Sequence, residues 1–409
     1  MCQVQENDIY KLNINETNIS SSRKLCAKCS KAAIIVVGTN GTFCEECFER
    51  YITHKFRASM GKNPIVRHGD KVLVAFSGGM NSAGLLWLIK SGLSVGAIRK
   101  LKFEPGVIFI DETALMENDQ EFLVKEVKTI MASTGFLYHV VKLEDVFHYL
   151  TNNKPCKNDC KDEVVSDKLG QVFQAAKTLT AKNELLYRLR CTLLSFKAKE
   201  LGYDHVFLGE TSTRVAINMM SNVALGRGVH VSQDAGFSDG NRCFPHGADL
   251  LRPIRDITAK EMAMYAQLHG VPIVTLANLY TGLQPMSSIQ QLTENFILGL
   301  VSGYPSTEMT VYRTSNKLQS SGFDYQTNSN LKKCNICQGL LDTHIREDQA
   351  SALMDTLLSE KISSGNLQDA VNDMSFNSLK DYSEGLCYAC MKMDKEFKNP
   401  LLSMCSGQS

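Results

Sequence analysis

Cysteine residues are the side chains in this sequence with the clearest capacity for chemistry. The chain has fourteen cysteines, and eight of them fall in four Cys-x-x-Cys pairs. Two thiolates separated by two residues can bind one metal ion from a tight turn, and two such pairs supply the four ligands of a tetrahedral site. Because four protein ligands leave no open position for water, a zinc ion bound in this way would be structural.

The cysteine pairs form one set near each end of the chain. The first set has 14 residues between its pairs and predicts a zinc module formed by Cys26, Cys29, Cys44 and Cys47. The second set has a longer insert between its pairs, and we predict a second zinc module formed by Cys334, Cys337, Cys387 and Cys390. Together the sets predict about two structural zinc ions per chain, the alternative being unliganded reduced thiols.

The other six cysteines have no spacing that indicates a metal site. Cys191 lies in a predicted helix, where a small buried side chain is expected. Cys156 and Cys160 lie in a predicted loop, where redox chemistry or metal binding is the alternative to a structural role. The remaining members of this group are Cys2, Cys243 and Cys405.

A glycine-rich turn is the second candidate site. The apolar run 72–76 leads into Ser77-Gly78-Gly79-Met80-Asn81-Ser82, and an apolar helical segment follows. At such a strand-to-helix turn, free backbone N–H groups and the helix dipole can face an anion. We therefore predict a nucleotide-binding loop formed by Ser77, Gly78, Gly79, Asn81 and Ser82. The turn lacks the lysine motif of a Walker A loop, and a plain turn is the alternative.

Composition and charge describe an ordinary globular protein. The 409 residues are 44% hydrophobic and 21% charged with a formal net charge of +1, so no global positive field draws the chain to nucleic acid. We predict no membrane span and no signal peptide, and therefore a cytoplasmic location. In that reducing compartment, cysteine pairs are more often metal ligands than disulfides.

Apolar strands and helices alternate through the middle of the chain. Strands are predicted at 72–76, 107–110, 137–141 and 206–208, and helices at 83–89, 117–132, 184–201 and 211–225. Such alternation favours right-handed crossovers and a parallel sheet, so we predict an α/β fold with a doubly wound, mostly parallel sheet. The stretches 151–162 and 226–247 break the alternation and are predicted as loops at the sheet rim.

These patterns divide the chain into five regions. Residues 1–24 are predicted as a disordered tail, residues 25–62 as the N-terminal zinc module and residues 63–300 as the α/β domain. Residues 301–333 are rich in Ser, Thr and Asn and are predicted as a linker. The remaining residues, 334–409, are predicted as the C-terminal zinc module with a helical insert.

The glycine turn and several flanking segments together resemble a known family. The turn is similar to the S-G-G-x-D-S motif of PP-loop ATP pyrophosphatases, which adenylate a substrate oxygen and release pyrophosphate. From about Leu25 onward the chain resembles the cytoplasmic tRNA 2-thiolation protein 2 family. The matching segments are Phe48-Glu49-Arg50-Tyr51, His54-Lys55-Phe56-Arg57-Ala58, Gly61-Lys62-Asn63, residues 105–112 and Leu386-Cys387-Tyr388-Ala389-Cys390.

The resemblance carries expectations about fold, substrate and partners. It implies a PP-loop core of the HUP type and a role in 2-thiolation of the wobble uridine of tRNAs for Lys, Glu and Gln. It also implies a heterodimer with the catalytic thiolase, tRNA 2-thiolation protein 1. Sulfur would arrive as a thiocarboxylate on a ubiquitin-related modifier.

The chain departs from the catalytic PP-loop thiolases at positions that the resemblance assigns to chemistry. Asn81 replaces the loop aspartate that helps to hold magnesium and nucleotide, and a neutral amide is a poorer ligand for Mg²⁺. Ala181 and Glu184 stand where active enzymes carry a Cys-x-x-Cys, and Leu251 stands for a third thiol. The segment 209–214 lacks the acidic pair of the usual Gly-His-Asn-x-Asp-Asp.

Because the scaffold is kept while these groups are absent, we predict no catalytic residue and an accessory role beside the catalytic thiolase. The rival interpretation is a PP-loop sulfurtransferase that adenylates tRNA with ATP and Mg²⁺, using Cys156, Cys160 or Cys243 as sulfur carriers. A third interpretation is a zinc-bearing scaffold that touches only protein.

Contact with tRNA is predicted at a local basic patch beside the N-terminal zinc module. The candidates for phosphate contact are His54, Lys55, Arg57 and Lys62. Such contacts would position the tRNA without reading its bases, which leaves the choice of uridine to the partner. Solvated surface charge is the alternative.

Overall fold

The structure is a computed structural model of the 409-residue chain. It describes residues 25–37, 41–94, 100–116, 121–152, 162–239, 247–276, 279, 287–315, 317, 333–339, 341 and 385–397. The predicted tail, about half of the predicted linker and the predicted helical insert lie outside the described residues. So do Cys2, Cys156, Cys160, Cys243 and Cys405.

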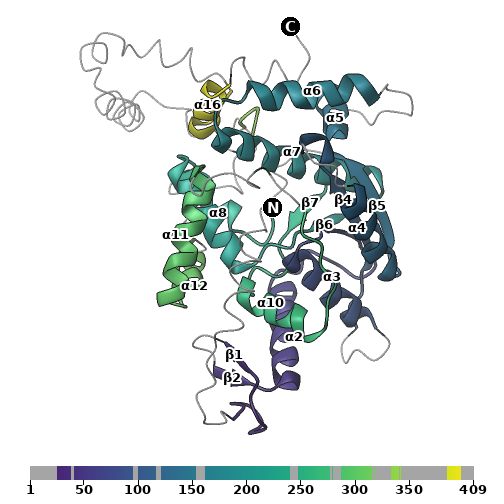
Figure 1. Ribbon diagram of the computed structural model, residues 1–409, viewed down its shortest axis with the longest axis vertical. Helices are drawn as coiled ribbons and strands as arrows, with labels where there is room; N and C mark the ends of the chain where they lie inside the picture. Colours follow the sequence, from purple (N-terminus) through teal and green to yellow (C-terminus); the bar gives the residue numbers. More distant parts are fainter. Residues whose placement is uncertain are drawn as a thin grey trace, which may run out of the picture.

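A parallel sheet forms the centre of the molecule (Figure 1). Its strands are β3 (Lys71–Ala75), β4 (Glu104–Asp111), β5 (Leu137–Lys142), β6 (His205–Phe207) and β7 (Asp249–Leu251), in the order β5-β4-β3-β6-β7. All neighbouring strands in this sheet are parallel. The chain moves outward from β3 on one side and then returns to its other side, so the doubly wound α/β prediction is confirmed.

The sheet is buried on both faces because alternate strand residues point to opposite sides. Val72 and Val74 of β3 belong to one core with α3 (Met80–Leu93), α4 (Glu121–Ser133) and α10 (Ala259–Leu268). Leu73 and Ala75 belong to the other core with α5 (Val146–Asn152), α6 (Asp162–Ala175) and α7 (Leu179–Glu200). This explains why the predicted strands are continuous apolar runs rather than alternating ones.

The N-terminal module shares the core of the α/β domain. It comprises the antiparallel strands β1 (Ile35–Val37) and β2 (Gly41–Phe43), followed by α2 (Glu45–Lys62). Phe48, Ile52 and Phe56 recur at helical spacing along α2, are at most 1% exposed and pack in the same core as α3 and α10. The module is therefore held by hydrophobic burial as well as by its own strands.

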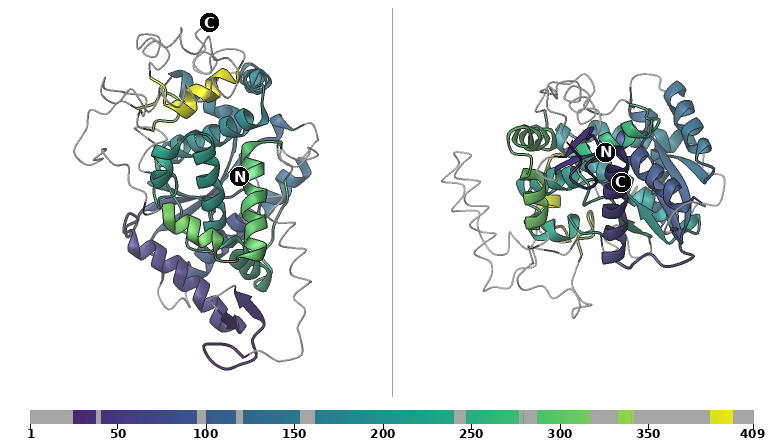
Figure 2. Two further views of the ribbon diagram at one scale, coloured as in Figure 1. Left: turned by 90° about the vertical axis from the view of Figure 1, so that its left-hand side faces the viewer. Right: turned by 90° about the horizontal axis from the view of Figure 1, so that it is seen from below.

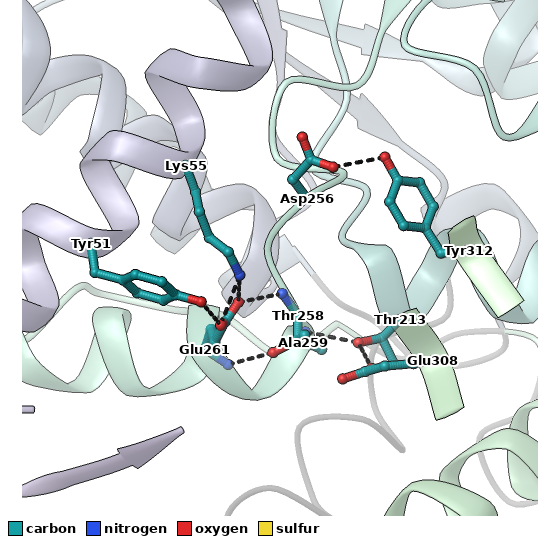
Figure 3. Close-up of polar contacts among 9 residues, drawn as sticks. All are labelled: Tyr51, Lys55, Thr213, Asp256, Thr258, Ala259, Glu261, Glu308 and Tyr312. Atoms are coloured by element: carbon teal, nitrogen blue, oxygen red, sulfur yellow. Dashed lines mark hydrogen bonds and ion pairs between the residues drawn. The ribbon is translucent and has the colours of Figure 1, made fainter. Parts of the chain in front are cut away.

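A buried carboxylate fixes α2 to α10 (Figure 3). The Nζ of Lys55 lies 2.7 Å from Glu261 Oε2, and the hydroxyl of Tyr51 donates to Glu261 Oε1 at 2.8 Å. The same carboxylate accepts from the backbone N–H of Thr258, whose hydroxyl accepts from the Glu261 N–H, forming a capping box. One glutamate therefore both starts α10 and holds the N-terminal module.

A group of three helices covers the side of the domain next to α10. These helices are α8 (Ser212–Ala224), α11 (Ile289–Gly303) and α12 (Thr307–Ser315). Arg214 pairs with Glu294 at 3.2 Å, and the hydroxyl of Thr213 accepts from the Ala259 N–H at 2.9 Å and donates to the buried Glu308. Helix α12 lies within the range 301–333, so an ordered helix occupies part of the region predicted as a linker.

The C-terminal module lies at the opposite end of the molecule from the N-terminal one (Figures 1 and 2). Its helix α16 (Tyr388–Lys395) begins directly after Cys387, contains Cys390 and lies beside α6 and α7. The backbone N–H of Lys177 donates to the Glu396 carbonyl at 2.9 Å, and Phe397 is buried in the core formed with α7. Each cysteine module is therefore docked on the α/β domain.

The buried pairing of Glu261 predicts a large loss of stability on its removal. Glu261→Ala should lower the free energy of unfolding by about 2–4 kcal/mol, because it removes a helix cap and leaves the Lys55 ammonium without its counter-ion. Denaturant unfolding monitored by circular dichroism measures this loss. The matched control is Glu46→Ala, which breaks the exposed Lys31–Glu46 pair and should cost less than about 1 kcal/mol. Equal effects of the two substitutions would contradict the prediction.

Candidate metal centres and the carboxyl edge of the sheet

The four N-terminal cysteines converge in one group. Cys26 and Cys29 lie on a turn before β1, Cys44 is the N-cap of α2, and Cys47 lies in its first turn. The four Sγ atoms lie within 4.8 Å of one another, with 3.5 Å between those of Cys29 and Cys44. Cys29 is exposed, so this group lies at the surface.

The four C-terminal cysteines form a second group despite the long insert between their pairs. The Sγ atoms of Cys334, Cys337, Cys387 and Cys390 also lie within 4.8 Å of one another, with 3.6 Å between Cys337 and Cys387. All four residues are at most 3% exposed. Two cysteine groups thus exist in the structure, and the predicted pairing of the distant C-terminal pairs is correct.

The two groups are built in the same way. In each, the N–H of the residue after the second cysteine donates to the carbonyl of the first: Ser30 to Cys26 at 3.0 Å and Gln338 to Cys334 at 2.9 Å. Ser30 and Gln338 both have positive φ, at 60° and 55°. The third cysteine of each group, Cys44 or Cys387, is the N-cap of a helix. This shared construction is the structural basis of the repeated Cys-x-x-Cys pattern.

The sulfur spacing fits a single metal ion. Tetrahedral thiolates at about 2.3 Å from one zinc ion stand about 3.8 Å from each other, close to the 3.5 Å and 3.6 Å distances found here. A polynuclear iron–sulfur cluster places several irons and bridging sulfides between its cysteines and needs a wider opening. Four sulfur ligands in tetrahedral spacing are typical of zinc and of a single iron ion.

Local hydrogen bonds and charges favour a thiolate at one or more positions of each group, whereas the pKa values of Cys47 and Cys390 are raised. Burial raises the pKa of Cys26, but backbone N–H groups of Cys44, Lys28 and Cys29 outweigh it and lower the pKa to about 6. Hydrogen bonds from the neighbouring thiols of its group lower the pKa of Cys337, and the charge of Arg188 adds to this. Thiolates are the metal-binding form of cysteine.

The glycine turn has the predicted position between β3 and α3. Gly78 has φ +80°, and a Cβ there would lie 3.0 Å from the carbonyl oxygen of Val274. The Ser77 N–H donates to Ser82 Oγ at 3.2 Å, and that hydroxyl donates to the Gly79 carbonyl at 2.9 Å. The turn is therefore closed by its own side chains. Nucleotide binding by Ser77, Gly78, Gly79, Asn81 and Ser82 stays a prediction.

Charged residues at the carboxyl edge of the sheet pair with one another. Glu210 follows β6 and Arg252 follows β7, and the two form an ion pair in which both side chains are at most 4% exposed. Burial opposes the charge of Arg252, but the Glu210 carboxylate more than offsets this and holds the pKa of Arg252 well above its usual value. Glu112, which follows β4, pairs with Arg190 of α7.

A second carboxylate cluster lies on α7, where the resemblance expects thiols. Glu184 accepts from Arg188 Nε at 2.9 Å and also pairs with Arg227. Ala181, one turn earlier, is buried among apolar side chains, as is Leu251 at the end of β7. The positions that would carry sulfur therefore carry a carboxylate or a buried apolar group. The Glu184–Arg188 pair has the helical spacing of four residues that sequence reasoning can read. The other ion pairs could not be found, because their partners are 78, 43 and 42 residues apart in Glu112–Arg190, Glu184–Arg227 and Glu210–Arg252, respectively.

The four candidate tRNA contacts lie on α2 in different environments. His54 and Lys62 are exposed and Arg57 is half-buried, whereas the Lys55 ammonium pairs with Glu261. Arg50 is exposed and shares a helix face with His54 and Arg57, at spacings of four and three residues. This helical spacing is the signal that could have added Arg50 to the predicted set.

These features define a doubly wound α/β protein that carries, among its described residues, two groups of four cysteines. The fold is similar to the solved structure of "U34-tRNA thiolase NcsA from Methanococcus maripaludis with its [4Fe-4S] cluster". The TM-score is 0.56 at 18% sequence identity, and the match covers 72% of this chain and 87% of that one. At this identity the likeness concerns the fold alone.

Sequence comparison identifies the family. The profile of the family described as cytoplasmic tRNA 2-thiolation protein 2 matches residues 288–392. The chain is 35% identical to the protein of that name from Danio rerio, over 91% of this chain and 83% of the relative. It is also 35% identical to the Homo sapiens protein, over 79% of this chain and 73% of the relative. The chain therefore belongs to the cytoplasmic tRNA 2-thiolation protein 2 family.

Membrane insertion finds no support in the described helices. Among the residues that the structure describes, no helix combines the length and the apolar character that a bilayer span requires.

The buried Glu210–Arg252 pair predicts a characteristic response to substitution. Arg252→Met should lower the free energy of unfolding by about 3–5 kcal/mol, because it leaves a buried carboxylate without its partner. Combining it with Glu210→Met should restore most of the loss, since an apolar pair of similar volume needs no counter-charge. Chemical denaturation of the three variants measures both effects. Additive losses in the double variant would contradict this account.

Proposed function

We propose that this chain is an accessory subunit for 2-thiolation of the wobble uridine in cytosolic tRNAs for Lys, Glu and Gln. It acts as a heterodimer with the catalytic PP-loop thiolase, tRNA 2-thiolation protein 1. That partner takes sulfur from the thiocarboxylate of a ubiquitin-related modifier. The family membership and the thiolase-like fold support a role in tRNA thiolation, and the names of the relatives support a cytoplasmic location.

One observation carries the accessory role. Glu184 and Leu251 stand where the resemblance expects sulfur-bearing residues, and both are buried. The carboxylates of Glu112, Glu184 and Glu210 are each paired with an arginine of the same chain. Sulfur transfer needs reactive thiols and an activated substrate oxygen. Because these carboxylates are already paired within the chain, they support the role of a subunit that stabilises its partner or presents tRNA.

The metal proposed for both cysteine groups is structural zinc, about two ions per chain. The ligands would be the four thiolates of each group, and each ion would join a Cys-x-x-Cys turn to a helix N-terminus. Zinc supplies no redox chemistry and here has no open coordination position. Its role is to fix the docked modules, whose side chains join the cores of the α/β domain.

The rival function is a PP-loop enzyme that adenylates the uridine by itself. It would need ATP and Mg²⁺ at the Ser77–Ser82 turn, where Asn81 replaces the usual acid. The candidate sulfur carriers Cys156, Cys160 and Cys243 lie outside the described residues. The neutral amide of Asn81, a poorer ligand for Mg²⁺ than a carboxylate, favours the accessory role.

Reconstitution separates the two functions. The chain, the catalytic thiolase and their complex are each incubated with tRNA, ATP and the thiocarboxylated modifier, and 2-thiouridine is measured by mass spectrometry. We expect thiolation from the complex, little from the thiolase alone and none from this chain. Pyrophosphate release or 2-thiouridine formation by the isolated chain would overturn the accessory role.

Phosphate contacts by α2 predict a change in salt dependence. For the complex binding tRNA, Arg57→Ala should reduce the slope of log K against log salt concentration by about 1, because one phosphate contact is lost. Lys55→Ala should leave the slope unchanged, since the Lys55 ammonium is already paired with Glu261. Filter binding across a salt series measures both. An equal loss for Lys55→Ala, in a variant whose circular dichroism matches that of the unmodified chain, would show that this lysine leaves Glu261 to contact RNA.

A further inference from the structure

The C-terminal cysteine group is enclosed by parts of the α/β domain that carry charge. Arg188 lies on α7, and Arg227 lies in the turn between α8 and the short helix η4 (Gly228–His230). The packing is close: a Cβ on Gly226 would lie 2.6 Å from the ring of Tyr388, and one on Gly339 would lie 2.9 Å from the imidazole of His230. The cysteine group therefore rests directly on the turn that contains Arg227.

The charges beneath the group do not cancel among themselves. Arg227 is 2% exposed, and its guanidinium shares the carboxylate of Glu184 with Arg188. Two guanidinium groups against one carboxylate leave an excess of one positive charge. Asp234 acts on Arg188 more weakly and is only half-buried. An excess charge this deeply buried is costly unless an anion lies nearby.

The C-terminal cysteine group is positioned to supply that anion, because the ring of Tyr388 packs against Gly226, next to Arg227. Burial opposes the charge of Arg188 and of Arg227, but Glu184 and the thiolates of Cys337 and Cys390 raise the pKa of both residues. Four neutral thiols would supply no negative charge. Four thiolates around one divalent cation form a complex with a double negative charge, which more than offsets the single excess positive charge at this position.

We propose that Arg188, Glu184 and Arg227 form the counter-charge of a metal–tetrathiolate complex, so that the C-terminal group takes one divalent thiophilic cation as a buried dianion. The proposal rests on the metal proposed above. It adds that the affinity of this group is set by side chains of the α/β domain. The N-terminal group differs, because the cation beside it, Lys31, is exposed and pairs with Glu46.

Metal competition tests the proposal on the full-length chain. Zn²⁺ is removed with a chromogenic chelator, and zinc ions that differ in affinity form separate classes in the titration. The class that is lost in the Cys334→Ser variant belongs to the C-terminal group. We expect Arg227→Met to weaken that class by about 10–100-fold and to leave the N-terminal class unchanged. The matched control is Arg190→Met, which breaks an ion pair on the same helix with Glu112 and should change neither class.

Glu184→Gln separates charge from packing. Glutamine keeps an oxygen that accepts from both arginines but removes the negative charge, so zinc should bind at least as tightly as in the unmodified chain. Arg227→Lys keeps the charge and should retain most of the affinity. Equal weakening by Arg227→Met and Glu184→Gln, or no weakening by Arg227→Met, would overturn the proposal. The metal affinity is measured in the absence of any thiolation reaction. The result therefore stands even if the proposed accessory role proves wrong.

Discussion

The pairing of buried guanidinium groups with carboxylates is the constraint on which the functional face of this protein depends. In an open parallel sheet, ligands bind outside the carboxyl ends of the strands, where the chain reverses direction across the sheet. Here Glu112, Glu210 and Arg252 follow three of those strands, and each is held by an opposite charge from the same chain. Removing either partner would leave the other charge buried and unpaired, which is strongly destabilising. Substitutions that would free these charges for chemistry therefore also weaken the fold.

The modules that contain the cysteine groups also contribute side chains to the hydrophobic cores of the α/β domain. A cysteine module of this size usually cannot bury enough apolar surface to fold alone. The N-terminal module solves this by contributing the buried face of α2 to the core around β3. The C-terminal module contributes Met393 and Phe397 to the core on the other side of the sheet. The two modules thus close the two cores of one domain.

Features specified by local sequence could be predicted, and features that depend on distant partners could not. The Cys-x-x-Cys turns predicted both metal groups because two ligands come from one turn, and continuous apolar runs predicted β3, β4, β5 and β6. The strand β7 is not marked in the sequence because it directly follows the stretch 226–247 predicted as a loop, whereas the equally short β6 follows a long predicted helix. Helix α10 carries a readable signal in Thr258 and Glu261, a capping box before an apolar run. Nothing local marks Lys55 as the partner of Glu261, 206 residues away.

Helix α2 belongs both to the N-terminal cysteine group and to the core of the α/β domain. Its first turn contains Cys47 and is capped by Cys44, while its next turns bury Phe48, Ile52 and Phe56 in the domain core. A helix propagates order along its axis because each turn is hydrogen-bonded to the one before. We therefore expect that oxidation of the exposed Cys29, or loss of the metal, would unfold the first turn of α2 and destabilise the turns that follow it. The redox state of this exposed thiol is therefore expected to influence the stability of the folded chain.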